Sequence, residues 1–333
     1  MKKTVICVLI ILVAAIGAGA AYYVSNSDAE NEFFAMDTYV TAKIHGFGAP
    51  AVSEKIEETV GTLDTSVLSR QSKDSDVFKL NKNHGGKLSG NMDSYLETML
   101  GIHEKSNGKY DFTLGALSDL WGFGKKPAVP DEEKIKKALD LCGADKIELG
   151  KSSVSFPKGM ILDFGSVGKG IALDEISSEL GRTKIKEAVV SVGGSVLLYG
   201  EKDFTVGITD PAAENGYMAV LTLPACCVST SGNYERFFEE DGKKYHHILN
   251  PENGYPADNG IVSCTVVSNR GIISDALSTA CFVLGIKEGR KLAESYGCET
   301  VFIDSKNNVY VSKGLKDRIE LTADGYTLKN YEG

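Results

Sequence analysis

The sequence predicts a mixed domain of the α+β class in which the strands pair mainly in antiparallel fashion. Helical and strand patterns alternate along the 333 residues without a long linker rich in Pro, Gly or Ser. Strand patterns crowd the middle of the chain, and they do not alternate with helices as a doubly wound parallel sheet would require. A hydrophobic content of 42% and a charged content of 24% are typical of a globular protein.

The first half of the chain predicts one strand and three helices. The strand covers residues 34–44. The first two helices carry apolar residues three or four positions apart, which places them on one helix face. The second of them lies behind a predicted Asn91 cap, and the third opens at residues 130–133 and ends near Gly143. The apolar positions of the first two helices are Val52, Ile56, Val60 and Leu63, then Met92, Tyr95, Leu96, Met99 and Ile102.

The second half of the chain combines many strands with three helices. The predicted strands cover residues 146–149, 154–156, 160–162, 188–192, 196–199, 204–208, 218–223, 226–229 and 262–268. One helix follows from the spacing of Ile171, Leu173, Ile176 and Leu180, and two more cover residues 274–284 and 287–296. Residues 300–303 and 309–311 are predicted to close the domain as a hairpin.

The first residues have the pattern of a membrane segment. Lys2 and Lys3 precede an almost unbroken apolar run over residues 5–24, and polar residues follow at 25–28. About 20 apolar residues suffice to cross a bilayer, with the lysines on the cytoplasmic side. We therefore predict an anchor and short linker at residues 1–30, and a single domain at residues 31–333 held outside the cytoplasm at the cell membrane. Cleavage at Ala18-Gly19-Ala20, as in a signal peptide, is the alternative.

The net charge limits the classes of binding partner, and the cysteine pattern indicates the state of the thiols. A net charge of -9 argues against nucleic acid as a partner, because its binders cluster Lys and Arg. An anionic substrate would instead need a metal ion or helix N-termini. The seven cysteines show no CxxC spacing, and six lie in apolar segments, so we predict buried, reduced thiols. The neighbours Cys226 and Cys227 should point to opposite faces of a strand.

A glycine-rich loop between a predicted strand and a helix indicates phosphate binding. It runs from Leu162 through Asp163, and ends in Gly168-Lys169-Gly170. Glycines let a backbone approach a phosphate closely, a helix start offers free N–H groups, and Lys169 adds a mobile positive charge. The spacing matches neither the Walker loop nor the dinucleotide fingerprint. A plain strand-to-helix turn is the alternative.

A histidine pair beside a turn predicts a general base. His246 and His247 precede Ile248-Leu249, and the turn of residues 250–254 contains Pro and Gly. Histidine accepts a proton near neutral pH, and a stiff turn would hold its ring in place. Since neighbours in a strand face opposite sides, one of the two can face a cleft, and we select His247. A structural, hydrogen-bonded histidine is the alternative.

Oxygen-bearing side chains near the start of a late helix predict a magnesium site. Asp275, Ser278 and Thr279 lie three and four positions apart, which places them on one helix face. Ligation by oxygen alone suits Mg²⁺, which also keeps waters and substrate phosphates in its shell. Alternatively, Asp275 charges the helix start and Thr279 packs inside.

The order of these motifs resembles that of the ApbE-type FAD:protein FMN transferases, from about residue 36 to residue 330. Individually several of the motifs are weak, but in this order they are highly specific. The further matching segments are Met36-Asp37-Thr38-Tyr39, Leu68-Ser69-Arg70, Asp74-Ser75-Asp76, Leu80-Asn81, residues 108–113, Val192-Gly193-Gly194, residues 207–211 and residues 230–236.

The resemblance implies an enzyme that binds FAD with Mg²⁺, cleaves its pyrophosphate and joins FMN to a threonine of an exported acceptor protein, releasing AMP. It implies that Asp275, Thr279, Ser278 and the carbonyl oxygen of Ser166 hold the metal. It also implies that His247 takes the acceptor proton, with orientation of the pyrophosphate as the alternative role of this residue. It also implies a T-fold-like architecture. The residues that it places along the flavin and adenosine pockets are Met36, Ser69, Gln71, Lys109, Tyr110, Asp111, Asp163, Lys169 and Ile248.

Two other functions are compatible with the same residues. A Mg²⁺-dependent FAD pyrophosphatase would use water in place of the threonine, and an extracytoplasmic flavin-binding protein would retain FAD uncleaved. Gln71 occupies a position where many members of the family have an aromatic residue able to stack on a ring of the dinucleotide. Glutamine stacks less well, so we predict weaker flavin retention. Phe112 replaces a frequent proline, a change that we expect to be tolerated.

Overall fold

The computed structural model describes residues 27–123, 125–213 and 215–330. The predicted anchor at residues 1–26 therefore lies outside the described part of the chain. Within the described ranges, no helix is both long enough and apolar enough to cross a membrane. Strand β1, Ser27–Ala35, already includes residues 27–30, which the prediction assigned to the linker.

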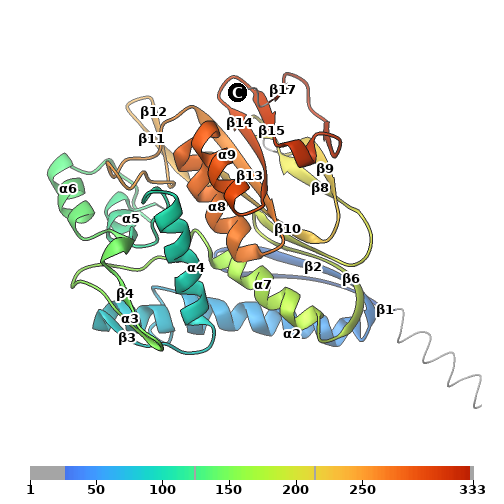
Figure 1. Ribbon diagram of the computed structural model, residues 1–333, viewed down its shortest axis with the longest axis horizontal. Coiled ribbons are helices and arrows are strands. Elements are labelled where there is room, and N and C mark those ends of the chain that lie inside the picture. Colours follow the sequence, from blue (N-terminus) through green and yellow to red (C-terminus); the bar gives the residue numbers. More distant parts are fainter. Residues whose placement is uncertain (1–26, 124, 214, 331–333) are drawn as a thin grey trace, which may run out of the picture.

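A nine-stranded sheet, counted over the described residues, forms the centre of the molecule (Figure 1). Its strands lie in the order β1, β2, β6, β7, β10, β13, β14, β15 and β17. Its first eight strands pair in antiparallel fashion, and β15 and β17 run parallel. After β1 the strands span Thr38–Phe47 (β2), Lys184–Val192 (β6), Ser195–Tyr199 (β7), Cys226–Gly232 (β10), Ile261–Ser268 (β13), Glu299–Asp304 (β14), Asn308–Val311 (β15) and Thr327–Asn330 (β17).

Helices cover one face of this sheet. Helix α2 (Ala49–Thr62) packs on β1 and β2, α7 (Gly168–Leu180) packs on β6 and β7, and α8 (Gly271–Leu284) packs on β10 and β13. Their apolar faces form the largest core cluster with the sheet. The remaining helices are α3 (Asp76–Asn83), α4 (Met92–Lys105), α5 (Gly115–Trp121), α6 (Glu132–Asp140) and α9 (Ile286–Ser295); a π-helical segment, Leu63–Leu68, extends α2, and Ala144–Lys146 and Lys313–Leu315 form 3₁₀ turns.

A second, smaller layer covers part of the opposite face of the sheet. Three strands, in the order β16, β9 and β8, pack on it around a second apolar cluster that includes Leu198, Val228 and Val301. Two further sheets, β3-β5-β4 and the hairpin β11-β12, lie among the helices at the other end of the molecule (Figure 1). These strands span Ile319–Leu321 (β16), Tyr217–Leu223 (β9), Phe204–Thr209 (β8), Gly85–Lys87 (β3), Ser153–Ser155 (β5), Glu148–Leu149 (β4), Phe237–Glu240 (β11) and Lys243–His246 (β12).

The predicted mixed α and β class with antiparallel strands is confirmed, and two predicted strands are wrong. The region predicted as one strand, residues 34–44, contains the turn of a hairpin, because Met36 and Asp37 adopt positive φ angles of 54° and 57° between β1 and β2. Both residues then turn the chain back in the manner of a type I′ turn. In place of the strand predicted at residues 160–162, Ile161 forms an isolated bridge to Leu114.

The six cysteines of the described residues are buried and unpaired, as predicted. Cys226 belongs to the apolar cluster under the small sheet, whereas Cys227 belongs to the cluster under the helices. The two neighbours therefore point to opposite faces of β10, which confirms the predicted alternation. Burial raises the pKa of both thiols. These thiols remain protonated at neutral pH and behave as small apolar side chains.

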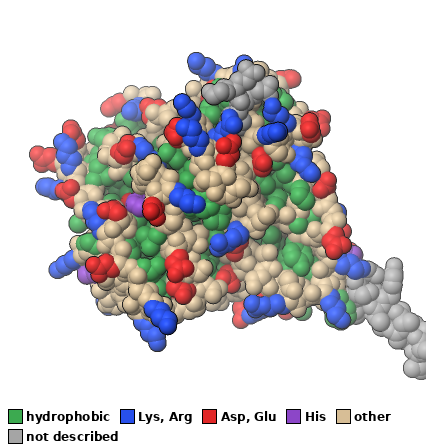
Figure 2. Space-filling model, in the orientation of Figure 1, with side chains coloured by type: hydrophobic (Ala, Val, Ile, Leu, Met, Phe, Trp, Pro, Cys, Tyr) green, Lys and Arg blue, Asp and Glu red, His purple; other side chains and the backbone are tan. Residues whose placement is uncertain are grey.

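Many charged side chains on the described surface pair with a neighbour of opposite sign. Lys43 lies 2.9 Å from Glu30, and Lys136 lies 2.8 Å from Glu132. Figure 2 shows Lys and Arg side chains interspersed with Asp and Glu over the face that it presents. That face consequently has no broad field to attract a polyanion.

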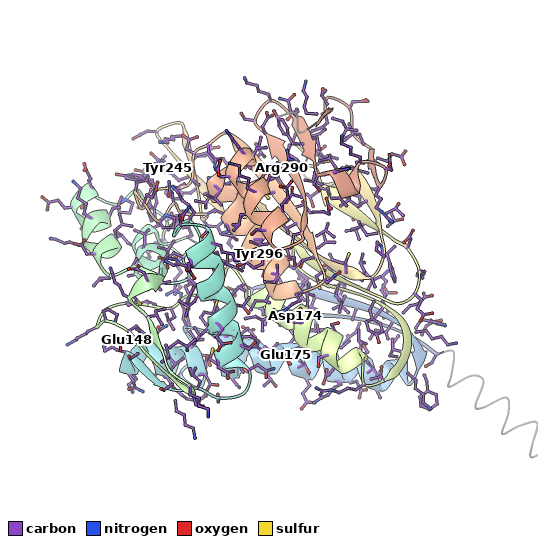
Figure 3. The ribbon with its side chains drawn as sticks, viewed as in Figure 1. Glu148, Asp174, Glu175, Tyr245, Arg290 and Tyr296 are labelled. Carbon is purple, nitrogen blue, oxygen red and sulfur yellow. The ribbon has the colours of Figure 1, made fainter. Side chains whose placement is uncertain are left out.

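Helices α7 and α8 cross in direct backbone contact at a pair of glycines. A Cβ on Gly170 would lie 2.2 Å from the carbonyl oxygen of Gly271, and a Cβ on Gly271 would lie 2.2 Å from that of Gly170. Asp174, labelled in Figure 3, supports the crossing because its carboxylate accepts hydrogen bonds from the backbone N–H groups of Gly271 and Ile272. This carboxylate satisfies free donors at the start of α8.

We expect Gly170→Ala to lower the free energy of unfolding by ~3 kcal/mol or more, the upper part of the range for overpacking. The reason is that the added methyl group meets backbone atoms, which cannot rotate away. Gly61→Ala is the matched control, because its Cβ would have nothing within 4 Å. In a helix interior that change should raise stability by up to ~1 kcal/mol. Urea unfolding of the two purified variants measures both effects, and equal midpoints would contradict the close crossing.

Candidate active site

The carboxylate of Asp275 joins α8 to the glycine-rich loop. Its Oδ2 accepts a hydrogen bond of 2.8 Å from the backbone N–H of Gly170, and its Oδ1 accepts one of 3.2 Å from the hydroxyl of Ser195 on β7. Asp275 is 3% exposed. Burial raises its pKa, and the positive charge of Lys169 and the N–H of Gly170 oppose that increase. Two motifs that are 105 residues apart thus meet at one carboxylate.

Three hydroxyl groups meet where α8 packs against β10. The hydroxyl of Ser231 on β10 lies 2.8 Å from that of Ser278 and 3.1 Å from that of Thr279. Ser278 is buried and also donates a hydrogen bond of 2.8 Å to the carbonyl oxygen of Asp275, whereas Thr279 is half-buried. Thr279 is therefore the more accessible of the two residues predicted to bind the metal through a hydroxyl group.

The chemistry of these donors fits a magnesium ion. The described residues contain no cluster of three or more His, Cys, Asp and Glu side chains suited to a metal. One carboxylate with hydroxyl and carbonyl oxygens is nevertheless a usual Mg²⁺ environment, because this ion takes much of its shell from water and substrate phosphates. Asp275 retains acceptor capacity beside its two hydrogen bonds, since a carboxylate offers about four lone-pair sites. Asp275 and Thr279 are the residues that could hold such an ion.

Lys169 provides the positive charge of the site. It lies in the first turn of α7. Its charge opposes the rise in pKa that burial causes at Asp275 and Glu235, and it adds to the lowering of the pKa that burial causes at His247. Burial dominates the shift at Glu235 and raises the pKa of its carboxyl group. Glu235 was missing from the predicted site residues, although its segment was among the matching motifs. A charged residue in a loop carries no periodic signal that would have identified it.

His247 is held with one ring nitrogen available. Its Nδ1 lies 3.2 Å from the carbonyl oxygen of Arg236, and its backbone N–H donates to the same oxygen at 3.0 Å. Because a carbonyl oxygen only accepts, Nδ1 carries the proton and Nε2 keeps its lone pair. Burial lowers the pKa of His247 to about 4, against the effect of the hydrogen bond to Arg236. The ring is therefore neutral at pH 7 and able to accept a proton.

His246 is a structural residue by comparison. Its Nε2 lies 3.0 Å from the carbonyl oxygen of Ala257, and its Nδ1 accepts a hydrogen bond of 3.3 Å from the N–H of Ile248. The buried ring also packs edge-on against Phe282. Both nitrogens are satisfied inside the protein, which leaves His247 as the histidine of the pair that can react. Ile248 is buried beside it and fixes the turn through its backbone.

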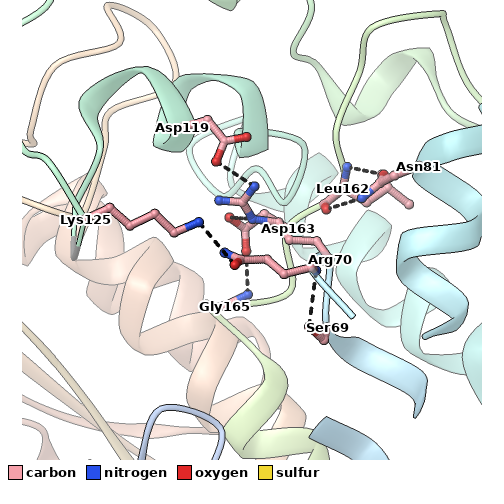
Figure 4. Close-up of polar contacts among 9 residues, drawn as sticks. Ser69, Arg70, Asn81, Asp119, Lys125, Leu162, Asp163 and Gly165 are labelled. Atoms are coloured by element: carbon pink, nitrogen blue, oxygen red, sulfur yellow. Dashed lines mark hydrogen bonds and ion pairs between the residues drawn. The ribbon is translucent and has the colours of Figure 1, made fainter. Parts of the chain in front are cut away.

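Arg70 fixes Asp163 at the start of the glycine-rich loop (Figure 4). Its Nε lies 3.0 Å from Oδ2 of Asp163, and its Nη1 lies 2.8 Å from Oδ1 of Asp119. Asp163 also accepts a hydrogen bond of 3.0 Å from the N–H of Gly165. Partial burial disfavours the charge of Arg70, but the two carboxylates outweigh this and raise its pKa. Arg70 is a second residue that the predicted site list lacked.

Ser69 and Gln71 flank this arginine and differ in exposure. The hydroxyl of Ser69 accepts hydrogen bonds from the N–H groups of Gln71, at 3.2 Å, and Ser72, at 3.1 Å. The side chain of Gln71 is exposed and accepts a hydrogen bond of 3.2 Å from Lys125. Ser69 thus holds the backbone of residues 69–72, and Gln71 lies beside Arg70 with its side chain exposed to solvent.

The predicted segment at residues 109–111 supports the loop from the other side. Tyr110 is buried, and its hydroxyl lies 3.5 Å from that of Ser166, while burial raises its pKa. Asp111 accepts hydrogen bonds from the N–H of Thr113, at 2.8 Å, and from its hydroxyl, at 2.6 Å. Tyr110 therefore touches the glycine-rich loop directly, and Asp111 holds the turn that carries it.

Two further predicted residues lie at the edges of the site. Lys109 forms an ion pair with Glu252 of the histidine turn. Met36 lies in the turn between β1 and β2, where its N–H donates a hydrogen bond of 2.9 Å to Asp64. Its side chain packs against the main core. The ion pair joins the segment of residues 109–111 to the histidine turn. Within the described part of the chain, Met36 has no such contact with the histidine turn, and its backbone is hydrogen-bonded to Asp64.

Comparison with known proteins places the chain in a family. The model of the ApbE family matches residues 36–302. This chain belongs to the ApbE family. A relative from Treponema pallidum named FAD:protein FMN transferase is 34% identical over 309 residues, which cover 84% of this chain and 85% of the relative. Another of that name, from Escherichia coli K12, is 28% identical over 293 residues, 83% of this chain and 84% of its own.

Solved structures of ApbE proteins share the fold. The ApbE protein of Thermotoga maritima has a TM-score of 0.79 and 29% identity, with 86% of this chain and 98% of that chain covered. The flavinyl transferase ApbE of Pseudomonas stutzeri has a TM-score of 0.74 and 28% identity, covering 84% and 91% of the two chains. The ApbE fold thus extends over nearly all of the described residues.

We expect the imidazole of His247 in this ApbE-family chain to be neutral at pH 7, with its proton on Nδ1. Its pKa of about 4 means that it should gain a second proton only well below the usual range of histidine. NMR of the ¹⁵N-labelled ring distinguishes the tautomers and follows the titration, and His247→Asn assigns the signal. A proton on Nε2, or titration near the ordinary value of ~6.5, would contradict the described geometry.

Proposed function

We propose that this chain transfers FMN from FAD to a threonine hydroxyl of an exported protein in a Mg²⁺-dependent reaction and releases AMP. The observation that carries the proposal is the junction of Asp275, Lys169 and His247 at the glycine-rich loop, in a member of the ApbE family. Curated relatives that match more than four fifths of this chain are named FAD:protein FMN transferases. Phosphoryl transfer needs mainly positioning and neutralisation of charge, which these residues can supply.

The pyrophosphate of FAD would lie against the start of α7. There the first N–H groups of the helix and the Lys169 side chain favour an anion. Asp275 and Thr279, with the carbonyl oxygen of Ser166, would hold Mg²⁺, and Ser278 would support Thr279 through Ser231. When bound, the ion would neutralise phosphate charge and orient the pyrophosphate. Lys169 would neutralise further charge at the same point.

His247 would act as the general base for the acceptor. Its Nε2 removes the proton of the threonine hydroxyl, and the oxygen then bonds to the phosphorus atom of the FMN half. The bond between that phosphorus and the bridging oxygen breaks, and AMP leaves with the electron pair. Because the ring is neutral at pH 7, it is ready to accept this proton.

The remaining residues would bind the two halves of FAD. Tyr110 and Asp163 border the glycine-rich loop, so they would lie closest to the pyrophosphate and its neighbours. The other residues proposed along the flavin and adenosine pockets are Met36, Ser69, Gln71, Lys109, Asp111 and Ile248. Most of these hold turns through hydrogen bonds, so their effect on FAD would come largely from the shape of the pocket.

The N-terminal segment completes the proposal. The apolar run at residues 5–24, behind Lys2 and Lys3, supports an anchor that keeps the catalytic domain outside the cytoplasm. An enzyme in that location would meet exported acceptors.

The T-fold-like description of the catalytic domain also remains a prediction.

We expect Thr279→Val to raise the Mg²⁺ concentration that gives half-maximal activity by at least ~10-fold, because the change removes a ligand oxygen and preserves the shape of the side chain. Thr279→Ser, which keeps the hydroxyl, is the matched control and should stay near the parent. Asp275→Ala should abolish turnover. AMP release from FAD, measured against Mg²⁺ concentration, checks all three. Parent-like behaviour of Thr279→Val or Asp275→Ala would refute the metal assignment.

Covalent transfer itself can be tested on the proteins that the enzyme would meet. The purified chain is incubated with FAD, Mg²⁺ and the exported and membrane proteins of its own cell, and flavin fluorescence is read on a denaturing gel. A fluorescent band whose peptide gains the mass of FMN at threonine, with AMP released, supports transfer. AMP and free FMN without a labelled protein would indicate the pyrophosphatase instead. Intact FAD would exclude both reactions.

A further inference from the structure

Three exposed aromatic side chains lie on two segments that Arg236 links: the β1-β2 hairpin, whose turn it contacts, and strand β11, which it directly precedes. Among the described residues, Phe34 is 65% exposed, Tyr39 is 66% exposed and Phe237 is 47% exposed. Large apolar side chains usually leave the surface, and exposed aromatics in a group often mark an interaction site. We call these three residues the aromatic rim.

Phe34 and Tyr39 form a fixed pair at the tip of the first hairpin. They are direct cross-strand partners in β1 and β2, two residues before and two after the turn at Met36 and Asp37. Their ring centroids lie 5.6 Å apart in an edge-on arrangement. The backbone of Tyr39 is held as well, because its carbonyl oxygen accepts a hydrogen bond of 3.2 Å from Gly193. A prearranged pair loses little conformational entropy when a partner binds.

Arg236 connects this hairpin to the proposed base. Its side chain lies 4.0 Å from the carboxylate of Asp37 in the hairpin turn, and its carbonyl oxygen accepts the Nδ1–H of His247 at 3.2 Å. Phe237 follows Arg236 directly, and the ammonium group of Lys244 lies 3.9 Å above the centre of its ring. Arg236 therefore links the hairpin turn that separates Phe34 from Tyr39 to the backbone that holds His247.

We propose that the aromatic rim is the docking surface for the acceptor protein, which would place an apolar or aromatic side chain on Phe34 and Tyr39 while its hydroxyl reaches His247. The inference rests on the proposed transfer of FMN to a protein, because such a reaction requires a protein surface beside the base. Enzyme and substrate meet transiently, and in such interfaces a few aromatic residues provide most of the binding energy.

The position of the rim favours the acceptor over FAD. Tyr110 and Asp163, which would lie closest to the pyrophosphate of FAD, are buried and partly buried at the glycine-rich loop. Phe34 and Tyr39 instead lie on the sheet face opposite α2, since their neighbours Phe33 and Val40 pack into the core under that helix. A surface outside the nucleotide pocket can select a protein without altering the affinity for FAD.

The test compares the turn end and the open end of the β1-β2 hairpin in the full-length chain. Phe34→Ser combined with Tyr39→Ser removes the pair, and Phe47→Ser is the matched control, an aromatic residue 47% exposed at the other end of β2. The probe is the protein labelled in the gel assay above, purified. We expect kcat/KM for this protein to fall at least ~10-fold in the rim variant. The control should match the parent, and both variants should retain the parent dissociation constant for FAD.

The outcomes separate this inference from the proposed function. If the parent labels no protein, the proposed transfer fails. If the parent labels the probe and the rim variant does so equally fast, or Phe47→Ser slows it equally, the docking surface is refuted. Sedimentation velocity of the enzyme alone adds a further outcome. A dimer that dissociates in the rim variant, without loss of transfer to the probe, would assign the rim to a second copy of this chain.

Discussion

The active site depends on the contact between Gly170 of α7 and Gly271 of α8. With no Cβ on either residue, each helix backbone reaches the other, and a methyl group on either one would lie 2.2 Å from a carbonyl oxygen. This closeness lets Asp275 accept the N–H of Gly170 at 2.8 Å. The same helix start carries Lys169, so the crossing also brings its positive charge near the carboxylate of Asp275. The close contact between the two glycines therefore brings the glycine-rich loop and the start of α8 together in one site.

The burial of Asp275 has an energetic consequence. A buried carboxylate loses hydration, and the raised pKa of Asp275 shows that its partners do not fully replace it. The hydrogen bonds from Gly170 and Ser195 and the charge of Lys169 keep the group in place. A divalent cation would favour the charged form and offset the remaining cost. The protein thus holds a buried carboxylate whose charged form its neighbours only partly stabilise, a local cost of the kind that functional sites often carry.

The sequence predicted elements whose packing follows a simple period and missed those set by turns or tertiary contacts. Helix α8 was predicted nearly to its ends because a long apolar stretch of helical length leaves few alternatives. Residues 34–44 read as one strand because Phe34, Tyr39 and Val40 favour strands on both sides of Met36, and the positive φ angles there leave no trace in side-chain type. In the site, Asp275, Lys169 and His247 belonged to recognisable motifs. Arg70 and Glu235 gain their roles only from neighbours distant in sequence.

A short helix couples the two halves of the site. Helix α5 presents Asp119 to Arg70, which holds Asp163, and it ends at Trp121, whose Nε1 donates a hydrogen bond of 2.8 Å to Gly254 of the histidine turn. The buried indole also packs among aromatic rings from the hairpin β11-β12, which leads into His246 and His247. The seven residues of α5 therefore contact both the loop beside the proposed nucleotide pocket and the turn that follows the proposed base. A displacement of α5 would therefore change the separation between Asp163 and the histidine turn, so a helix without a proposed reacting group sets the spacing between the two halves of the proposed site.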